Sequence, residues 1–392
     1  MAKIATGLDQ FKEEAWKRLK GQSLGLLANQ ASVDHNLQNA KEVISTLVPG
    51  QLKILFGPQH GFRAEDQDNM VETEDYLDAE LHIPVFSLYG NARDDLPNIL
   101  DTIDLLIIDL QDVGTRVYTF ITTMLYALKG AARAGKRVLV LDRPNPLGGM
   151  ILEGNLLRPE CYSLVGPFAL PMRHAMTMGE IALLFKDAFK IDCEITVLPL
   201  RGWHRHMVWK DTGLTWIMPS PNMPVLETAQ VYPGQVMWEG TNISEGRGTC
   251  RPFEIFGAPF INPSIVKKLL APKDMEGCYL REHYFRPTFH KWKGELCGGF
   301  MIHVLNPDLY RPFRTSLAFL KIVIETYRDE FAWRKPPYEY DFKRLPIDLI
   351  LGDPSIRTML EEGRDIGRVL EDCSEELEGF LESRKPYLIY SA

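Results

Sequence analysis

The chain has 392 residues, of which 45% are hydrophobic and 24% charged, and its formal net charge is −8. These values are typical of a folded protein of about two domains, and they exclude a disordered chain and a fibre. The acidic balance also argues against a general nucleic-acid binder, because such a protein needs a basic face.

Membrane and export signals are the next feature of the sequence. The longest aliphatic runs, such as residues 105–108, fall far short of the ~20 residues that span a bilayer. The first 21 residues contain no continuous apolar segment of the signal-peptide type. We therefore expect a cytoplasmic protein that has neither a membrane nor a nucleic acid as partner.

Six cysteines are scattered along the chain, without a CxxC pair or a histidine at zinc-finger spacing. A cytoplasmic chain of this size does not need disulfides, so we expect these thiols to be reduced. His204 and His206 flank Arg205, a pattern more typical of a solvated strand edge or loop than of a metal site. The sequence thus predicts no metal and no cofactor.

The first half of the chain alternates short β-rich runs with helical patterns, which predicts a parallel, doubly wound sheet of the α/β class. Residues 104–110 are almost continuously apolar, as expected for a strand covered on both faces. Thr177 and Glu180 match a capping box, which predicts the start of a helix that runs to about residue 190. The other expected helices cover residues 10–20, 39–47 and 117–134, and the expected strands cover residues 23–28, 52–56, 84–88, 104–110, 137–141 and 194–198.

Near residue 228 the pattern changes, because glycine and proline punctuate the chain and strands no longer alternate cleanly with helices. Here we expect a smaller α+β domain with a strand over residues 299–304 and helices over 316–329 and 371–383. The predicted domains are residues 1–228 and 229–392, with a ligand cleft between them.

Polar side chains follow each of the first five predicted strands. In chain order these segments are Asn29 with Gln30, residues 57–69, Tyr89 with Gly90, residues 111–116 and residues 142–149. The carboxyl ends of parallel strands meet at one edge of the sheet, where open α/β sheets bind their ligands. The sequence therefore predicts a polar ligand at this edge.

The nature of this ligand is narrowed by the motifs that are missing. No GxGxxG follows the first strand, no GxSxG lies at a turn from a predicted strand into a helix, and GxxxxGK[ST] and HExxH do not occur. Because the protein has no phosphate-binding backbone motif, the polar ligands that remain as candidates are sugars and small acids. Sugar chemistry uses carboxyl groups as acid, base or nucleophile, and the candidates in or near the loops are Glu65, Asp66, Asp68, Asp112 and Asp142.

Two further segments carry suitable chemistry. Arg173 offers a cation to an acidic ligand and His174 titrates near neutrality, although a helix-entry loop with solvated charges explains this pair equally well. At the expected domain junction, Glu239, Glu245 and Arg247 lie among three glycines, which let a backbone approach a ligand. We expect this junction segment to line the cleft.

Taken together, the polar segments resemble those of the exo-β-N-acetylmuramidase (NamZ-like) family, formerly a domain-of-unknown-function family. The resemblance rests on Asn29-Gln30, residues 57–63, 112–119, 142–149, 220–224 and 239–249, in the same order. It implies a Rossmann-like N-terminal domain, a smaller C-terminal domain and release of a terminal N-acetylmuramic acid from peptidoglycan fragments. It also implies an arginine partner for the lactyl carboxylate of that sugar, and the available cations are Arg63, Arg116, Arg143, Arg173 and Arg247.

One departure from the family pattern concerns the chemistry directly. The family usually has Pro-Glu-His-Gly after the second strand, and that glutamate is its proposed catalytic residue, whereas this chain has Gln59. An amide orients water or a hydroxyl but does not exchange a proton as a carboxyl group does. Export is common among relatives, whereas this chain shows no export signal, so we expect cytoplasmic recycling of wall fragments.

The favoured hypothesis is therefore a glycoside hydrolase that acts on a muramic-acid-containing saccharide. The alternatives are a non-catalytic saccharide-binding relative that lost its acid at Gln59 and, disfavoured by the missing glycine fingerprint, a nucleotide-sugar enzyme. The predicted catalytic residues are Gln59, His60, Glu65, Asp68, Glu239 and Glu245. The predicted substrate-binding residues are Asn29, Arg63, Asn69, Asp112, Thr115, Arg116, Tyr118, Asp142, Arg143, Asn145, Arg173, His174, Asn222, Asn242 and Arg247.

Overall fold

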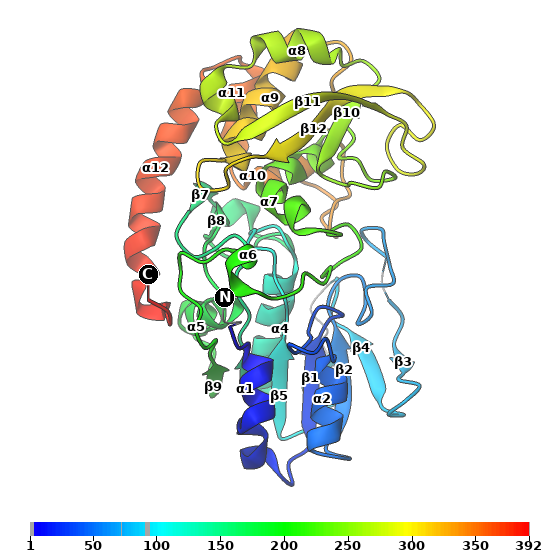
Figure 1. Cartoon of the computed structure of the whole chain (residues 1–392), viewed down its shortest axis with the longest axis vertical. Helices are drawn as coiled ribbons and strands as arrows, with labels where there is room; N and C mark the ends of the chain where they lie inside the picture. Colours follow the sequence, from blue (N-terminus) through cyan, green and yellow to red (C-terminus); the bar gives the residue numbers. More distant parts are fainter. Residues whose placement is uncertain (1–3, 72, 91–94, 392) are drawn as a thin grey trace.

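The computed structural model describes residues 4–71, 73–90 and 95–391. Its first part is built around a seven-stranded sheet whose strands are parallel, except that β3 runs antiparallel to β4 (Figure 1). In spatial order the strands are β3 (Tyr76–Leu77), β4 (Pro84–Ser87), β2 (Leu52–Gly57), β1 (Leu24–Ala28), β5 (Leu105–Asp109), β6 (Arg137–Leu141) and β9 (Ile195–Leu198). The predicted α/β class is confirmed.

Helices cover both faces of this sheet, which explains why β5 is buried along its whole length. The apolar side chains of α1 (Gly7–Glu13) and α2 (Ala40–Leu47) pack on one face. Those of α3 (Leu96–Leu100), α4 (Phe120–Arg133) and α5 (Met178–Ala188) pack on the other.

A second, smaller part is built around an antiparallel sheet in the order β10 (Ile255–Ala258), β12 (Cys297–Val304) and β11 (Cys278–Phe285). The connection between the parts includes the paired strands β7 (Glu153–Leu156) and β8 (Pro171–Arg173), and the short helix α6 (Trp209–Thr212). Helix α12 (Ile366–Ser383) runs back along the side of the molecule to the first part (Figure 1). The remaining helices are α7 (Leu226–Gln235), α8 (Pro263–Leu269), α9 (Pro312–Thr326), α10 (Pro346–Leu351), α11 (Pro354–Glu361) and α12 (Ile366–Ser383).

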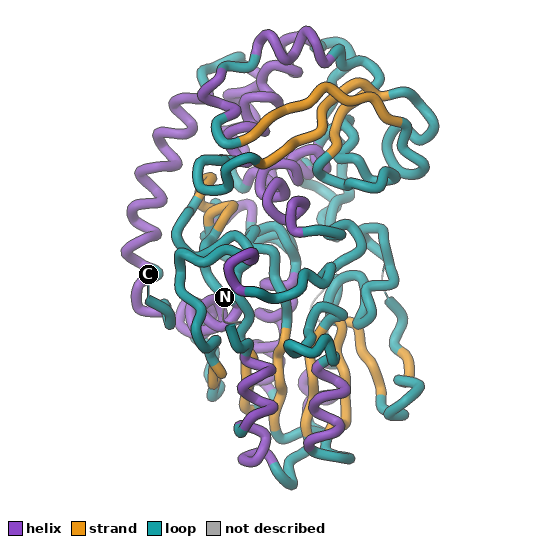
Figure 2. Tube along the Cα trace, in the orientation of Figure 1, coloured by secondary structure: helices purple, strands orange, loops and turns teal. Residues whose placement is uncertain are grey.

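The two parts share a hydrophobic core. One continuous cluster of buried side chains joins Leu106 of β5 and Phe120 of α4 to Trp238, Phe256 and Phe313 of the second part. Between the strands of the parallel sheet and the second part lies a layer of loops (Figure 2). These loops are held from both sides, so the side chains they carry have fixed positions.

The element boundaries differ from the predicted ones at four helices. Helices α9 and α12 begin four and five residues before the predicted residues 316 and 371, because Pro312 and the Asp365 cap start them, and α1 and α4 differ as well. The expected helix over residues 10–20 is wrong in extent: α1 begins earlier because the Thr6–Asp9 capping box fixes its start, and residues 15–19 form a separate 3₁₀ turn. Helix α4 begins at Phe120 instead of residue 117, since residues 115–119 turn first toward the loop layer. The capping box at Thr177 and Glu180 is confirmed.

Candidate active site

A pocket in the loop layer brings together side chains from both parts of the chain. Its empty volume is about 370 Å³. From the first part it is lined by residues that follow β2 and precede α4, and from the second part by residues of the junction segment and of a loop before α10. The polar side chains that line the pocket include those of Gln59, His60, Asn69, Tyr118, Thr119, Asn222, Glu239, Arg247, Tyr338 and Glu339.

Gln59 lies at the centre of a buried hydrogen-bond network. Thr119 Oγ1 donates to Gln59 Oε1 at 2.6 Å, which fixes the orientation of the amide. Gln59 Nε2 then donates to the Tyr89 hydroxyl at 2.9 Å and to Glu339 Oε1 at 3.2 Å. Tyr89 in turn donates to Glu339 Oε2 at 2.6 Å. A carboxyl group thus lies within hydrogen-bonding distance of the amide that stands where the family has a glutamate.

The environment of Glu339 favours its protonated form. Burial raises the pKa of this carboxyl to about 7, and the nearby negative charge of Glu239 also raises it, against the opposing hydrogen bonds from Tyr89 and Gln59. A carboxyl group with a pKa near neutrality is suited to donate a proton to a leaving group.

Glu239, the second carboxylate of the pocket, is held in place by two hydrogen bonds. Arg247 Nη2 donates to Glu239 Oε1 at 2.7 Å, and the Tyr338 hydroxyl donates to Glu239 Oε2 at 2.6 Å. Behind Arg247 lies the fully buried Glu245, whose oxygens are 3.3 Å from Arg247 Nε and 2.8 Å from Lys291 Nζ. The alternating charges hold Glu239 and Arg247 in position without exposure to water.

His60 contributes a neutral imidazole. Burial lowers its pKa to about 4. Its Nδ1 is 2.6 Å from the Asp66 carbonyl oxygen, which fixes the tautomer that carries its proton on Nδ1. Nε2 is therefore left as a hydrogen-bond acceptor.

The backbone at this pocket adopts conformations that ordinary side chains disfavour. His60 has φ 73°, and Glu339 has φ 46°, both in the left-handed region. Strain of this kind persists only where surrounding contacts hold it, and it clusters at functional sites. The contacts of Glu339 with Tyr89 and Gln59 supply that restraint.

Seven of the residues predicted from the sequence line this pocket: Gln59, His60, Asn69, Tyr118, Asn222, Glu239 and Arg247. Asn69 Oδ1 accepts from Arg247 Nη2 at 3.2 Å, and Asn222 Nδ2 donates to the Gln67 carbonyl at 3.1 Å. Glu245 lies one layer behind them, in contact with Arg247.

The structure does not bring the acids of the second-strand loop into the pocket. Glu65 and Asp68 are exposed, and their carboxylates accept hydrogen bonds from the nearby backbone amides of Arg63 and Asn69. Loop geometry turns these side chains outward, so the carboxyl group beside Gln59 comes from Glu339 instead.

Most of the other predicted binding residues serve the backbone. Asn29, Asn145 and Asn242 donate to the carbonyls of Pro219, Met176 and Glu330. These donors are thereby occupied within the fold.

The predicted acidic and histidine residues of the fourth and fifth loops are likewise buried outside the pocket. Asp112 accepts from the Gly114 amide at 2.6 Å and lies 3.2 Å from His174 Nε2. Thr115, which follows Gly114 in the chain, is fully buried. Asp142 accepts from the amide of Gly179 near the start of α5 and from Thr177 Oγ1, so it stabilises that helix start.

All five arginines predicted as carboxylate partners have protein partners. Arg116 donates to four backbone carbonyls, two of them from α10, and therefore ties the two parts together. Arg143 pairs with Asp109, Arg173 donates to the Leu147 carbonyl, and the exposed Arg63 lies 3.7 Å from Asp78. Only Arg247 of the five lines the pocket, where it pairs with Glu239 and Glu245.

Glu339, Tyr338 and Thr119 are not among the residues predicted for the site, and Tyr89 was predicted only as a polar residue at the end of a strand. Glu339 lies in a stretch of prolines and tyrosines that matches no catalytic pattern, and it is 280 residues from Gln59. The only local signal is an isolated glutamate between two tyrosines, which is not distinctive without the fold.

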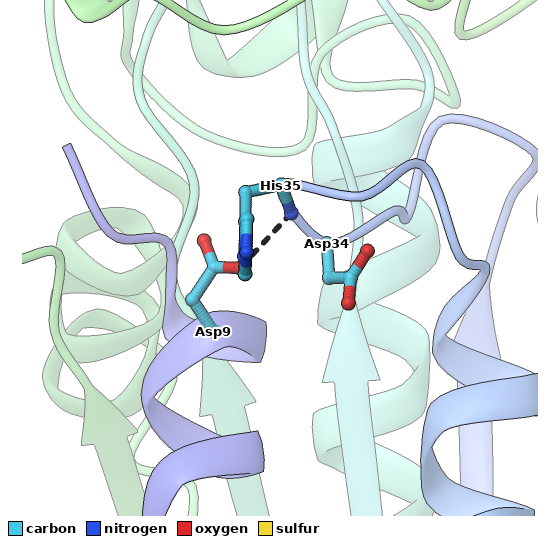
Figure 3. A group of neighbouring side chains, drawn as sticks. All are labelled: Asp9, Asp34 and His35. Carbon is cyan, nitrogen blue, oxygen red and sulfur yellow. Dashed lines mark hydrogen bonds and ion pairs between the residues drawn. The ribbon is translucent and has the colours of Figure 1, made fainter. Parts of the chain in front are cut away.

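One group of acidic and histidine side chains among the described residues has metal-site geometry, namely Asp9, Asp34 and His35 (Figure 3). Its potential ligand atoms already have protein partners. Lys12 Nζ lies 2.6 Å from Asp34 Oδ2, and His35 Nδ1 lies 2.8 Å from Asp9 Oδ1. Since Lys12 pairs with Asp34 and His35 with Asp9, we assign the group as an ion-pair network.

Within the part of the chain that the structure describes, no helix has the length and apolar character required to cross a membrane.

Comparison with known proteins gives consistent matches. The N-terminal model of the exo-β-N-acetylmuramidase NamZ family matches residues 24–227, and the C-terminal model matches residues 230–390. The chain is 39% identical over 388 residues to the peptidoglycan β-N-acetylmuramidase NamZ of Bacillus subtilis (strain 168), which covers 99% of this chain and 92% of that protein.

Two solved structures from Bacteroides fragilis, both of DUF1343 family proteins, resemble the whole chain. The first has 29% sequence identity and a TM-score of 0.88, and each chain is covered completely. The second has 24% identity and a TM-score of 0.78 over 100% of this chain and 99% of the other, which supports the fold alone.

Proposed function

The chain belongs to the exo-β-N-acetylmuramidase NamZ family, and we propose that it hydrolyses the glycosidic bond of a terminal N-acetylmuramic acid in peptidoglycan-derived saccharides. The position of Glu339 carries this proposal, since its carboxyl lies 3.2 Å from Gln59 Nε2. Glycoside hydrolysis requires a proton donor and usually a second carboxylate on the other side of the bond. Glu339 and Glu239 supply these two groups in one buried pocket.

In this mechanism Glu339 is the general acid. Burial raises its pKa to about 7, so a large fraction of the carboxyl groups carries a proton near neutral pH. The proton passes to the glycosidic oxygen as the bond from that oxygen to the anomeric carbon breaks, and a water molecule then adds its oxygen to the anomeric carbon and gives up a proton. Gln59 and Tyr89 hold the carboxyl in place through their hydrogen bonds.

Glu239 is the anionic partner. Arg247 and Tyr338 hold its carboxylate in place, so that this group faces the positive charge that develops at the anomeric carbon. His60, Asn69 and Asn222 then offer acceptor and amide groups to the sugar hydroxyl and acetamido groups. The stereochemical outcome follows from the anomer of the released sugar, which NMR of the fresh product measures.

The non-catalytic alternative rests on Gln59, because an amide does not act as an acid. Glu339 beside Gln59 favours the enzyme over a binding protein, since it places a titratable carboxyl at the same point. The missing glycine fingerprint continues to disfavour a nucleotide-sugar enzyme.

Hydrolysis of a chromogenic β-N-acetylmuramide tests the proposal. Glu339→Gln should lower kcat by about 10²- to 10⁴-fold, the usual contribution of a general acid. Glu65→Gln is the matched control, because it makes the same change at an exposed carboxyl outside the pocket, and it should retain full activity. An unmodified protein without hydrolysis would support the binding alternative, and a fully active Glu339→Gln variant would remove Glu339 from the mechanism.

The pH dependence tests the same assignment without a mutation. Only the protonated form of Glu339 acts as an acid, so kcat should fall as the pH rises through about 7. A rate that stays constant up to pH 9 would contradict the role of Glu339.

We further propose that the cleft lies between domains of residues 1–228 and 229–392, because the pocket takes Gln59 and Tyr118 from one side and Glu239 and Glu339 from the other. We also propose that the protein recycles wall fragments in the cytoplasm. All six cysteines are free, which favours a reducing compartment. Cell fractionation with detection of the native protein tests this location.

A further inference from the structure

A second pocket adjoins the wall of the candidate active site and has no role in the mechanism above. It is lined by Thr241, Asn242, His290, Lys291, Trp292 and Arg334, and its empty volume is about 810 Å³. We call it the Arg334 pocket.

Two contacts connect the Arg334 pocket to the active site. The Arg334 guanidinium carbon lies 5.8 Å from the centre of the Tyr338 ring, and the Tyr338 hydroxyl donates to Glu239 Oε2. Lys291 Nζ lies 2.8 Å from Glu245 Oε2, and Glu245 contacts Arg247. Residues that line the Arg334 pocket therefore contact Tyr338 and, through Glu245, Arg247, both of which line the active-site pocket.

Arg334 differs from the five arginines that the sequence suggested as carboxylate partners. Its side chain is half-buried, and among the described residues its guanidinium forms no ion pair with a carboxylate. Lys291, the other cation of the pocket, uses its donors on the carbonyls of Trp238 and Ile243 and on Glu245. Arg334 is thus the cation that remains available to a ligand in this pocket.

The opposite side of the pocket is fixed in shape. His290 has φ 66° and Trp292 has φ 59°, so the residues on both sides of Lys291 hold left-handed backbone conformations. The three bonds of Lys291 and the bond from Trp292 Nε1 to the Asn242 carbonyl, 2.6 Å long, maintain this loop. An indole and an available guanidinium consequently line one preformed pocket.

We propose that the Arg334 pocket binds a carboxylate of the substrate, with Arg334 as the ion-pair partner and Trp292 as the apolar surface beside it. A guanidinium binds a carboxylate through two parallel hydrogen bonds, and this geometry suits a planar acid group. This inference rests on the proposed function, since it assigns a subsite for an acidic substituent of the same saccharide.

The carboxylate has two possible sources in a muramic-acid saccharide. It belongs either to the lactyl group of the sugar itself or to a peptide attached to that lactyl group. Titration calorimetry of the unmodified protein distinguishes them with two ligand pairs: N-acetylmuramic acid against its methyl ester, and an N-acetylmuramoyl dipeptide with a free terminal carboxylate against its terminal amide.

A preference for the acid over its uncharged counterpart should appear in one of the two pairs. That preference should fall by about 10- to 100-fold in Arg334→Gln, which corresponds to the loss of a charge-assisted bidentate contact. Arg334→Lys should retain part of it, because lysine keeps the charge but not the two-bond geometry. Lys335→Gln, which removes an exposed positive charge at the next position, should leave the preference unchanged.

Equal affinities of the unmodified protein and Arg334→Gln for every ligand would overturn the inference. Thermal unfolding of each variant excludes a folding defect. Hydrolysis of the chromogenic muramide is measured separately, so a protein that binds acids through Arg334 without hydrolysis would overturn the proposed function and retain the subsite. A protein that hydrolyses the muramide but binds every ligand equally well with and without Arg334→Gln would retain the proposed function and overturn the subsite.

Discussion

The Gln59→Glu substitution, which restores the family's glutamate, should change the pH dependence of hydrolysis in this chain and not merely raise the rate. The new carboxylate would lie at the position of Gln59 Nε2, 3.2 Å from Glu339 Oε1. At an effective dielectric constant of about 20, two unit negative charges at that distance repel each other by about 5 kcal/mol. The two carboxyl groups would therefore share one proton and titrate as a pair.

The expected result is a shift of the descending limb of the kcat–pH profile toward higher pH, because the pair holds its last proton more tightly than Glu339 does alone. The variant also loses the donor that Gln59 Nε2 offers to Tyr89, so its free energy of unfolding should fall by about 1 kcal/mol. The assay is hydrolysis of the chromogenic muramide between pH 5 and 9, with urea unfolding in parallel. An unchanged pH profile would refute the inferred contact between positions 59 and 339.

Three further predictions concern the buried side chains of Glu153, Arg116 and Thr119. Burial raises the pKa of Glu153 to about 7, so the free energy of unfolding falls as the pH rises from about 4.5 to 7 and this carboxyl loses its proton. Glu153→Gln should therefore raise the free energy of unfolding by up to about 3 kcal/mol over the unmodified protein at pH 8 and by little at pH 4, as measured by urea unfolding. Arg116→Met should lower the free energy of unfolding by about 4 kcal/mol at constant pH, because it leaves four buried carbonyls without their donor, and a calorimetric change below 1 kcal/mol would contradict that role. Thr119→Val removes the bond that orients the Gln59 amide and leaves Gln59 Oε1 buried without a donor, so it should lower kcat about tenfold and the free energy of unfolding by about 1–3 kcal/mol. An unchanged kcat would show that Gln59 needs no such support.

The parallel sheet was predictable because its signals are local. The apolar run over residues 104–110 and the capping box at Thr177 depend on neighbours a few residues away, and the structure confirms both. The same reasoning placed Gln59 and His60 at the carboxyl end of a strand, where a ligand is expected. The start of α1 was missed because the Thr6 cap lies outside the apolar repeat.

The role of each charged side chain was decided by tertiary structure. Arg116 and Arg334 carry the same group, but the fold surrounds the first with four backbone carbonyls and leaves the second at a pocket. Glu65 and Glu339 have equal intrinsic acidity, but the first faces water and the second is buried against Tyr89.

By itself, the sequence determined the class of fold, the edge of the sheet that carries the site and the family. Only the tertiary structure decided which carboxyl group lies beside Gln59. Hydrophobic periodicity and capping act over one or two turns of chain, whereas the contact between Gln59 and Glu339 joins residues 280 positions apart. That contact exists because a single core packs both parts of the molecule together, and the pKa of Glu339 follows from the burial that this packing imposes.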